Sequence, residues 1–344
     1  MSDHLARARA VHLERVRARE RHAVRSLAWC IALFGGACVS ASIVLWESKI
    51  DGDVRDALGA RAWVAQGGVI ALGVVTALAA LVTHAADPGV AQPSARDDDG
   101  AACVARLDDA IAEAVERETN ASNAVDSYSD RIRASIERVV ADDAEASALG
   151  MDKLYDGTWT KRGDDGHEEH RIKWCGTCKL WRPRNSTHCA TCDVCVRRFD
   201  HHCGIVGNCI GEYNHRWFLV LLSSGACFGL LIFLVAAYSL ACMSNREWRD
   251  SAYPYMLLAC TLAGFHVLGL LGFAWSHLVI FSIDVTTKQY VQKARGESIL
   301  DVRRRALTHD SCYKRCCHVP LRLKSTAMRE FRARRREAGS DAAV

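Results

Sequence analysis

Four long apolar runs restrict the folds open to this chain. Two of them, Ser26 to Trp46 and Ala62 to Ala85, contain no charged residue, and two more extend over Trp217 to Met243 and from Tyr253 to Ile283. About 20 helical residues, each rising 1.5 Å, cross the 30 Å hydrocarbon core of a bilayer. Buried helices of a soluble domain rarely run this far without a charge. The pattern therefore predicts four transmembrane helices.

Basic residues at both ends of the chain predict its orientation. The first 25 residues carry seven arginines, and arginine triplets occur at 303–305 and 334–336. The positive-inside rule places both termini in the cytosol, with the short loops 47–61 and 244–252 on the far side. The first apolar run is too long for the core of a cleaved signal peptide. Basic ends beside membrane spans fix topology and touch anionic lipid, so we expect a bilayer and no nucleic acid as partner.

An even number of spans also places the long central segment in the cytosol. We therefore predict an all-α polytopic membrane protein with four transmembrane helices and a small, cysteine-rich cytosolic domain. The expected segments are a basic N-terminus at 1–25, transmembrane helices 1 and 2 at 26–85, an acidic insert at 86–170, the cysteine-rich domain at 171–216, transmembrane helices 3 and 4 at 217–283, and a basic C-terminal tail at 284–344.

The acidic insert has the pattern of amphipathic helices. Apolar residues recur at helical spacing, and an acidic triplet stands at 97–99. The apolar positions are Leu107, Ile111, Val115, Ile132, Ile136 and Val140. We interpret the insert as solvated helices with no chemistry of its own. No internal repeat is apparent in the chain.

Cysteines crowd the segment that follows. Seven of the 16 cysteines lie between Cys175 and Cys209, with C-x-x-C pairs beginning at Cys175 and Cys189. A reducing cytosol disfavours disulfides, and paired cysteines with nearby histidines are typical of tetrahedral zinc sites. The segment is therefore predicted to be a small, zinc-stabilised cytosolic domain.

The number of potential ligands exceeds what two zinc ions need. Seven cysteines and the histidines at 188, 201 and 202 make ten candidates, whereas two closed tetrahedral sites use about eight. One cysteine and one histidine are left over, which is the pair that an activated thiol requires. The alternatives are that the surplus pair is inert, or that His215 or His167 replaces a ligand.

The full series of spacings resembles the cysteine-rich domain of the DHHC protein S-acyltransferases, or palmitoyltransferases. It reads C-x2-C-x9-HC-x2-C-x2-C-x4-DHHC-x5-C-x4-N-x3-F, from Cys175 to Phe218. Asp87-Pro88-Gly89 after the second apolar run resembles the DPG motif of that family, and the residues 286–289 resemble its TTxE motif. The resemblance covers roughly residues 26–90 and 170–290.

The resemblance implies a role for each member of the series. One structural zinc ion would be held by Cys175, Cys178, His188 and Cys195. The second would be held by Cys189, Cys192, His202 and Cys209. Asp200, His201 and Cys203 then remain for catalysis, with His201 as base, Asp200 orienting it, and Cys203 as nucleophile.

The implied reaction moves a long-chain acyl group, palmitoyl by expectation, from acyl-CoA to cysteine thiols of membrane-associated proteins through an acyl-enzyme on Cys203. The expected location is the endomembrane system, in the Golgi, endoplasmic reticulum or plasma membrane. Small residues of the spans, among them Gly225 and Gly229, either line a cavity for the acyl tail or allow close helix packing. The CoA phosphates need cations, for which the candidates are Arg182, Arg184, Arg197 and Arg198.

Three departures from the family pattern bear on activity. Family members usually have Pro-Trp where this chain has Gly204-Ile205, Arg where it has Asn185, and Glu where it has Gln289. A catalytically silent zinc-finger membrane adaptor is therefore the alternative function. A second cluster, Cys312, Cys316 and Cys317, is interpreted as juxtamembrane thiols open to acylation rather than as a metal site.

Overall fold

The computed structural model describes residues 60–121, 128–154, 157–162, 171–242, 253–291, 298 and 321–340. The first apolar run at 26–46 and the cysteine cluster at 312–317 lie outside the described residues. The chain divides into two units, which we describe separately. The first unit comprises Met1–Pro88 and Phe199–Leu323, and the second comprises Gly89–Arg198 and Lys324–Val344.

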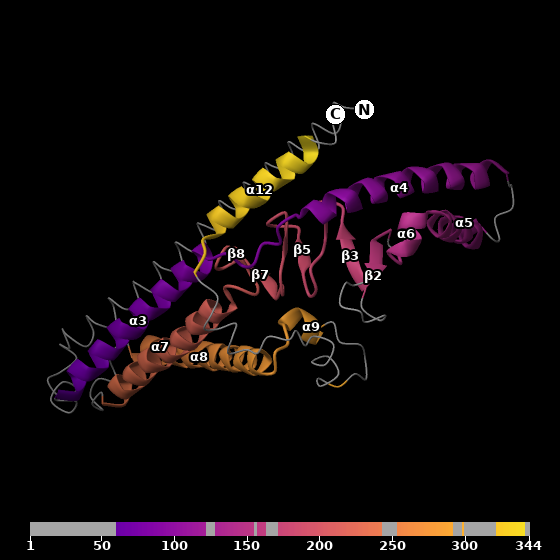
Figure 1. The fold of residues 1–344 in the computed structure, drawn as a ribbon. Coiled ribbons are helices and arrows are strands. Elements are labelled where there is room, and N and C mark those ends of the chain that lie inside the picture. The colour runs from indigo at the N-terminus through magenta and orange to yellow at the C-terminus, as the bar shows by residue number, and fades with distance from the viewer. Residues whose placement is uncertain are drawn as a thin grey trace. The chain divides into compact units, whose positions relative to one another are not determined.

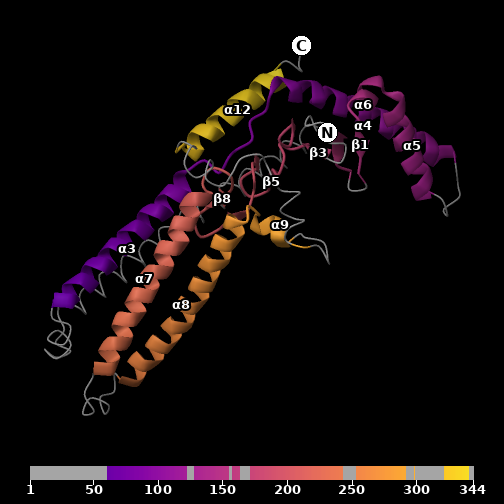
Figure 2. The same ribbon diagram turned by 60° about the horizontal axis from the view of Figure 1, so that its bottom comes forward.

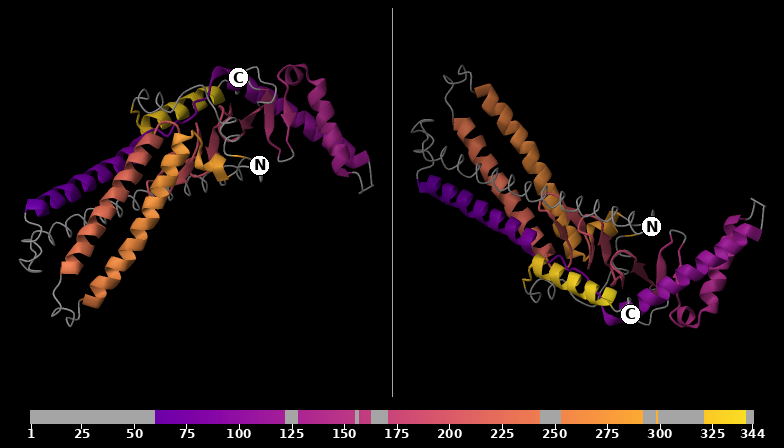
Figure 3. Two further views of the ribbon diagram at one scale, coloured as in Figure 1. Left: turned by 90° about the horizontal axis from the view of Figure 1, so that it is seen from below. Right: turned by 90° about the horizontal axis from the view of Figure 1, so that it is seen from above.

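Three long helices dominate the described part of the first unit. They are α3 (Ala60–Ala85), α7 (His215–Cys242) and α8 (Tyr253–Ser282), with α7 packed between the other two in Figures 1 and 2 and in both views of Figure 3. Within the described part of the chain, three segments are long and apolar enough to cross a membrane, namely Val64–Ala85, His215–Tyr238 and Ala263–Ser282. Three of the four predicted apolar helices are thus confirmed as helices.

Small and polar residues lie where these helices touch. The Thr76 hydroxyl of α3 donates to the Ser224 hydroxyl of α7 over 3.1 Å, and both side chains are buried. A Cβ atom added at Gly225 would lie 3.6 Å from the Thr76 methyl, and one at Gly229 would lie 3.4 Å from a methyl of Val267. Close approach of helices is typical of small residues in membrane proteins. These two glycines serve helix packing.

A short hairpin of the first unit is attached to the end of α3. It consists of β7 (His201–Cys203) and β8 (Asn208–Ile210), which pair antiparallel. The buried amide of Asn208 donates to the carbonyl oxygens of Thr83, His84 and Ala86 at 2.8–3.0 Å. Carbonyls at a helix C-terminus have no partner within the helix, so a side chain that binds three of them fixes the hairpin against α3.

The second unit combines helices with antiparallel strands. A four-stranded sheet has the order β1-β2-β3-β4, and β5 pairs with β6 in a separate hairpin. The strands are β1 (Asp152–Lys153), β2 (Trp159–Arg162), β3 (Arg171–Cys175), β4 (Leu180–Trp181), β5 (Thr187–Cys189) and β6 (Val194–Val196). The helices are α4 (Ala95–Ala121), α5 (Tyr128–Asp142), α6 (Ala144–Ala148) and α12 (Lys324–Ser340).

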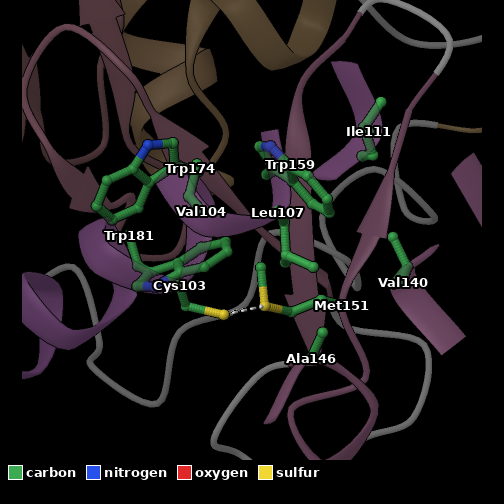
Figure 4. Packing of buried hydrophobic residues seen from close by; sticks show 10 residues of the cluster. All are labelled: Cys103, Val104, Leu107, Ile111, Val140, Ala146, Met151, Trp159, Trp174 and Trp181. Atoms are coloured by element: carbon green, nitrogen blue, oxygen red, sulfur yellow. Dashed lines mark hydrogen bonds between the residues drawn. The ribbon is translucent and has the colours of Figure 1, made fainter. Parts of the chain in front are cut away.

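The insert helices and the start of the cysteine-rich segment share one hydrophobic core. Leu107, Ile111 and Val140, which were predicted as the apolar faces, are buried there together with Trp159, Trp174 and Trp181 (Figure 4). Trp174 and Trp181 stand at opposite positions of β3 and β4 with ring centroids 5.1 Å apart. The predicted amphipathic helices are confirmed, but one face of α4 and of α5 packs on this core rather than facing solvent.

The strands differ from the prediction of an all-α protein. All of them are short, and those around the cysteines are hairpin arms of two to five residues. C-x-x-C spacing predicts metal ligands, and it says nothing of the backbone that carries them. The protein is mostly helical, with cysteine-bearing β-hairpins.

Candidate functional site

Four predicted zinc ligands come together within the second unit. Cys175 ends β3, Cys178 lies in the turn that follows, and His188 on β5 stands opposite Cys195 on β6. Their donor atoms all lie within 4.8 Å of one another, and the three cysteines are buried. The Nδ1 atom of His188 lies 3.3 Å from the Cys178 sulfur and 3.6 Å from the Cys175 sulfur.

The donor set fits a tetrahedral zinc ion. With Zn–S bonds of about 2.3 Å and Zn–N bonds of about 2.0 Å, a sulfur and a nitrogen on one ion lie about 3.6 Å apart. The observed separations of 3.3 Å and 3.6 Å match this edge. Three thiols and an imidazole are also the soft and borderline ligands that zinc prefers. Cys175, Cys178, His188 and Cys195 would therefore hold one structural zinc ion.

The second predicted set is divided between the two units. Cys189 and Cys192 belong to the second unit, and His202 and Cys209 belong to the first. His202 and Cys209 occupy opposite positions of β7 and β8, with the His202 Nδ1 atom 3.6 Å from the Cys209 sulfur. This separation again matches that of two ligands on one zinc ion. Each unit therefore presents half of a donor set.

The cysteine turns repeat every 14 residues, which the sequence analysis missed. Cys175, Cys189 and Cys203 each begin a turn in which a backbone N–H four residues later donates to the cysteine carbonyl over 2.8 Å. The donors are Lys179, Asp193 and Gly207, and all three have positive φ, of 53°, 56° and 71°. The first two turns contain a second cysteine, at Cys178 and Cys192, whereas the third has Val206 at that position. Cys203 thus has the backbone setting of a zinc ligand without the second thiol.

Asp200, His201 and Cys203 lie together in the first unit. The Asp200 side chain is buried, with the residue 2% exposed, and its Oδ2 lies 2.7 Å from His201 Nδ1. The other oxygen, Oδ1, accepts the backbone N–H of Thr287. His201 also lies close enough to Cys203 to lower the pKa of its thiol. The three side chains form a connected series from carboxylate to imidazole to sulfur.

This connection shifts the pKa of each group. Burial would raise the pKa of Asp200, but the hydrogen bond with His201 and nearby positive charge lower it to about 2. Burial would lower the pKa of His201, but its interactions with Asp200 and Cys203 raise it to about 9. Burial would raise the pKa of the Cys203 thiol, whereas His201 and two backbone N–H groups of the following turn lower it. The arrangement favours a thiolate beside an imidazolium.

Thr287 is the first residue of a short helix, α9 (Thr287–Val291), which positions its backbone N–H. The Thr286 backbone N–H donates to the Gln289 side chain over 2.9 Å, and the Gln289 N–H donates to the Thr286 hydroxyl over 3.2 Å. This reciprocal pair is a capping box, a role for which Gln and Glu are equivalent. The departure at Gln289 therefore preserves the local structure. The contact of this motif with Asp200 could not be predicted from its sequence.

Apolar side chains border the Cys203 thiol on one side. Cys203 packs against a cluster between α7 and α8 that consists of Ile210, Phe218, Leu222, Ala226 and Ala274. The His201 ring meets the Phe218 ring edge-on, with centroids 5.3 Å apart. On the other side Gly204 is exposed, and Ile205 is 62% exposed. The thiol thus lies between an apolar helix interface and an open turn.

The other two departures have simple local explanations. Asn185 has a φ of 58°, in the left-handed region, where Asn is among the most tolerant non-glycine residues. A Cβ atom built at Gly204 would meet nothing within 4 Å. Asn is therefore suited to the backbone at position 185, and lack of space does not require glycine at position 204.

The four arginines proposed for CoA all belong to the second unit. Arg184 is exposed, and Arg182, Arg197 and Arg198 are half-buried. The structure keeps them within one short stretch around the β5–β6 hairpin, and their role in binding CoA stays a prediction.

Two further histidines lie beside Asp200, namely His215, considered above only as an alternative zinc ligand, and His277, which the sequence analysis did not assign. His215 opens α7, His277 lies in α8, and both are 3% exposed. Their donor atoms and a carboxylate oxygen of Asp200 lie within 4.8 Å of one another. His277 had a signal in the sequence, because an ionisable residue inside a membrane span is a functional candidate by default.

Fold and site together describe a protein with three helices long and apolar enough to cross a membrane, and with a cysteine-rich segment in which the Cys203 thiol lies beside His201 and an apolar cluster. Residues 168–294 match the family model described as DHHC palmitoyltransferase. The chain thus contains a domain of the DHHC family, whose members are protein S-palmitoyltransferases, and it is an enzyme. A search of curated proteins found no match to the chain.

Proposed function

We propose that the chain transfers a long-chain acyl group, palmitoyl in the first instance, from acyl-CoA to protein cysteines through an acyl-enzyme on Cys203. The observation that carries this proposal is the series Asp200, His201 and Cys203, in which a buried carboxylate supports an imidazole that contacts the thiol. The family match supports the reaction class.

The first half-reaction acylates the enzyme. His201 holds the thiol proton, and the Cys203 thiolate attacks the thioester carbonyl of acyl-CoA. The bond between the acyl carbon and the CoA sulfur breaks. His201 gives its proton to the departing CoA thiolate, so that CoA leaves as the free thiol. Asp200 keeps Nδ1 of His201 engaged, which leaves Nε2 for proton transfer and stabilises the imidazolium.

The second half-reaction runs the same steps on a protein thiol. His201 takes the proton of the substrate cysteine, whose sulfur attacks the acyl carbon on Cys203. The Cys203 thiolate leaves and is restored to the state in which the cycle began. The overall reaction is a two-step, ping-pong transfer that consumes no further reactant.

The apolar cluster beside Cys203 accounts for use of a long acyl chain. Each methylene that enters an apolar environment contributes about 0.8 kcal/mol. A chain that starts at the thiol and runs along Phe218 and Leu222, between α7 and α8, would gain this contribution repeatedly. Substrates are then membrane-associated proteins with cytosolic cysteines, and Arg182, Arg184, Arg197 and Arg198 are the proposed contacts of the CoA phosphates.

Zinc is a scaffold in this proposal. One ion would be bound by the four ligands within the second unit, and another would join Cys189 and Cys192 to His202 and Cys209. Structural zinc contributes on the order of 10 kcal/mol of folding free energy, so hairpins of two to five residues would depend on it.

We further propose four spans, with both termini and the segment 86–216 in the cytosol of a cell with an endomembrane system. A tag inserted near Ala121 should then be protected from an impermeant reagent in intact cells, and a tag near Gly52 should lie on the opposite side of the membrane. Finding both tags on one side would contradict four spans.

The function is tested with purified full-length protein and palmitoyl-CoA. We expect CoA release and an acyl label on the enzyme that neutral hydroxylamine removes, because hydroxylamine cleaves thioesters and spares amides. Cys203→Ser should form no hydroxylamine-sensitive label. Well-folded parent protein that forms no acyl-enzyme would contradict the proposal.

A further inference from the structure

Asp200, His215 and His277 form a buried cluster of metal-binding groups outside the cysteine sets. Asp200 precedes β7, His215 opens α7 and His277 lies on α8, so three elements of the first unit converge. One carboxylate oxygen and one nitrogen of each imidazole lie within 4.8 Å of one another, and no residue of the three is more than 3% exposed.

The His277 side chain gives a second, independent indication of a ligand. Its Nδ1 atom is buried and has no hydrogen-bond partner among the residues that the structure describes. Leaving a buried polar group unsatisfied costs about 1–3 kcal/mol, and the cost disappears when something binds there. The ring itself is held by Phe273 and Phe218, with centroid separations of 4.5 Å and 5.3 Å. His277 is thus a potential metal ligand whose ring is held by two phenylalanines and whose Nδ1 atom forms no hydrogen bond within the described residues.

The donor chemistry selects the ligand. Two imidazoles and one carboxylate form a set that suits zinc and similar divalent ions, and metal sites with open positions commonly use it. Zinc ligands of this kind lie about 3.5 Å apart on a tetrahedral ion, so small side-chain rotations would bring the three donors onto one ion. Tetrahedral cysteine sites such as the two proposed above have no open position, whereas this set would leave one.

We propose that Asp200, His215 and His277 form a third metal site, which takes a divalent zinc ion and inhibits the enzyme when occupied. Inhibition follows from the position of Asp200, whose carboxylate also supports His201. A divalent cation bound to that carboxylate offsets its negative charge. The carboxylate then stabilises the protonated, positively charged form of His201 less well. The inhibitory part rests on the proposed acyl transfer, whereas the binding part does not.

The first measurement is direct binding. Full-length protein in detergent micelles is treated briefly with a weak chelator that leaves the cysteine-bound zinc in place, and zinc is then titrated back while bound metal is measured. We expect one further ion per chain above the chelator-resistant zinc. In parallel, acyl-enzyme formation from palmitoyl-CoA should slow at least tenfold as this ion binds, and a chelator should restore it.

Matched variants assign the site. His277→Phe keeps an aromatic ring beside Phe218 and Phe273 and removes both nitrogens, so it should bind the further zinc at least tenfold more weakly. His266→Phe removes an exposed histidine from the same helix and should bind it as the parent does. Equal retention of the further ion in both variants would overturn the assignment, as would a parent that binds no further ion.

Cobalt provides a readout that does not depend on variants or on activity. Cobalt at an Asp-His-His site should give weak visible bands, whereas cobalt bound to cysteines elsewhere in the chain adds intense thiolate charge-transfer bands in the near ultraviolet. Charge-transfer bands for the added ion would refute the site. Binding with the predicted spectrum supports the metal site even if the parent shows no acyl transfer, in which case the proposed function and the inhibitory role fail and the site itself stands.

Discussion

Serine substitution at two equivalent cysteine turns should give opposite results, and the contrast tests the assignment of both. Cys175 and Cys203 begin turns with the same 2.8 Å hydrogen bond and with positive φ at the residue that closes them. The chemical change, one sulfur replaced by oxygen, is identical. Only the expected partner differs, since Cys175 faces a metal set and Cys203 faces His201.

The magnitudes follow from these partners. Structural zinc contributes on the order of 10 kcal/mol, which is comparable to the whole stability of a typical domain at about 5–15 kcal/mol. Cys175→Ser should therefore lose zinc, and the β5–β6 hairpin should lose its structure because its three-residue arms, which carry His188 and Cys195, form a sheet of only two strands. Cys203→Ser removes no predicted ligand, so zinc content and melting temperature should match those of the parent. Its acyl-enzyme should be absent.

The assay combines elemental zinc analysis, thermal unfolding in detergent and hydroxylamine-sensitive labelling with palmitoyl-CoA. Equal zinc loss in the two variants would return Cys203 to the list of ligands. A Cys175→Ser protein that keeps all of its zinc and its fold would refute the metal set that the distances support.

Three further predictions concern residues in and next to the site. His201→Ala should slow acyl transfer by about 10²- to 10⁴-fold at unchanged zinc content, since general-base assistance has this size, whereas His202→Ala should lose zinc and fold; a His201→Ala enzyme near parental rate would remove it from the mechanism. Gln289→Glu should retain activity because the capping box survives, and Gln289→Ala should slow transfer by displacing the donor to Asp200; equal rates would refute this link. Asn208→Ala should destabilise the first unit by about 2–4 kcal/mol in chemical denaturation, because its three acceptors lose their donor; an unchanged midpoint would argue against that anchor.

Much of the architecture could be predicted because it depends on composition and spacing. The helices α3, α7 and α8 follow from apolar runs longer than a bilayer requires, and the cysteine sets follow from C-x-x-C spacing. The faces of α4 and α5 that carry Leu107 and Val140 followed from helical periodicity. In each case the signal lies within a short window of sequence.

The parts that could not be predicted depend on contacts across long separations. Nothing around Thr287 indicates that its N–H binds Asp200, 87 residues away. The core formed by Trp159, Trp174 and Trp181 with α4 also joins distant segments. The 14-residue repeat escaped notice for another reason, because only its cysteines, its histidine and its turn geometry recur while the remaining side chains vary.

The repeat has a consequence for the number of reactive thiols. Each predicted zinc set takes two cysteines from one turn and borrows its histidine and its last cysteine from the next repeat, as in Cys175 and Cys178 with His188 and Cys195. Each repeat therefore depends on the next one for two ligands, and the third repeat, which begins at Cys203, has no following repeat to supply them. One repeat beyond His202 and Cys209 the chain has Arg216 and Ser223, already in α7. In the proposed function Cys203 is left as a reactive thiol because the repeat ends there, at the start of the apolar helix α7.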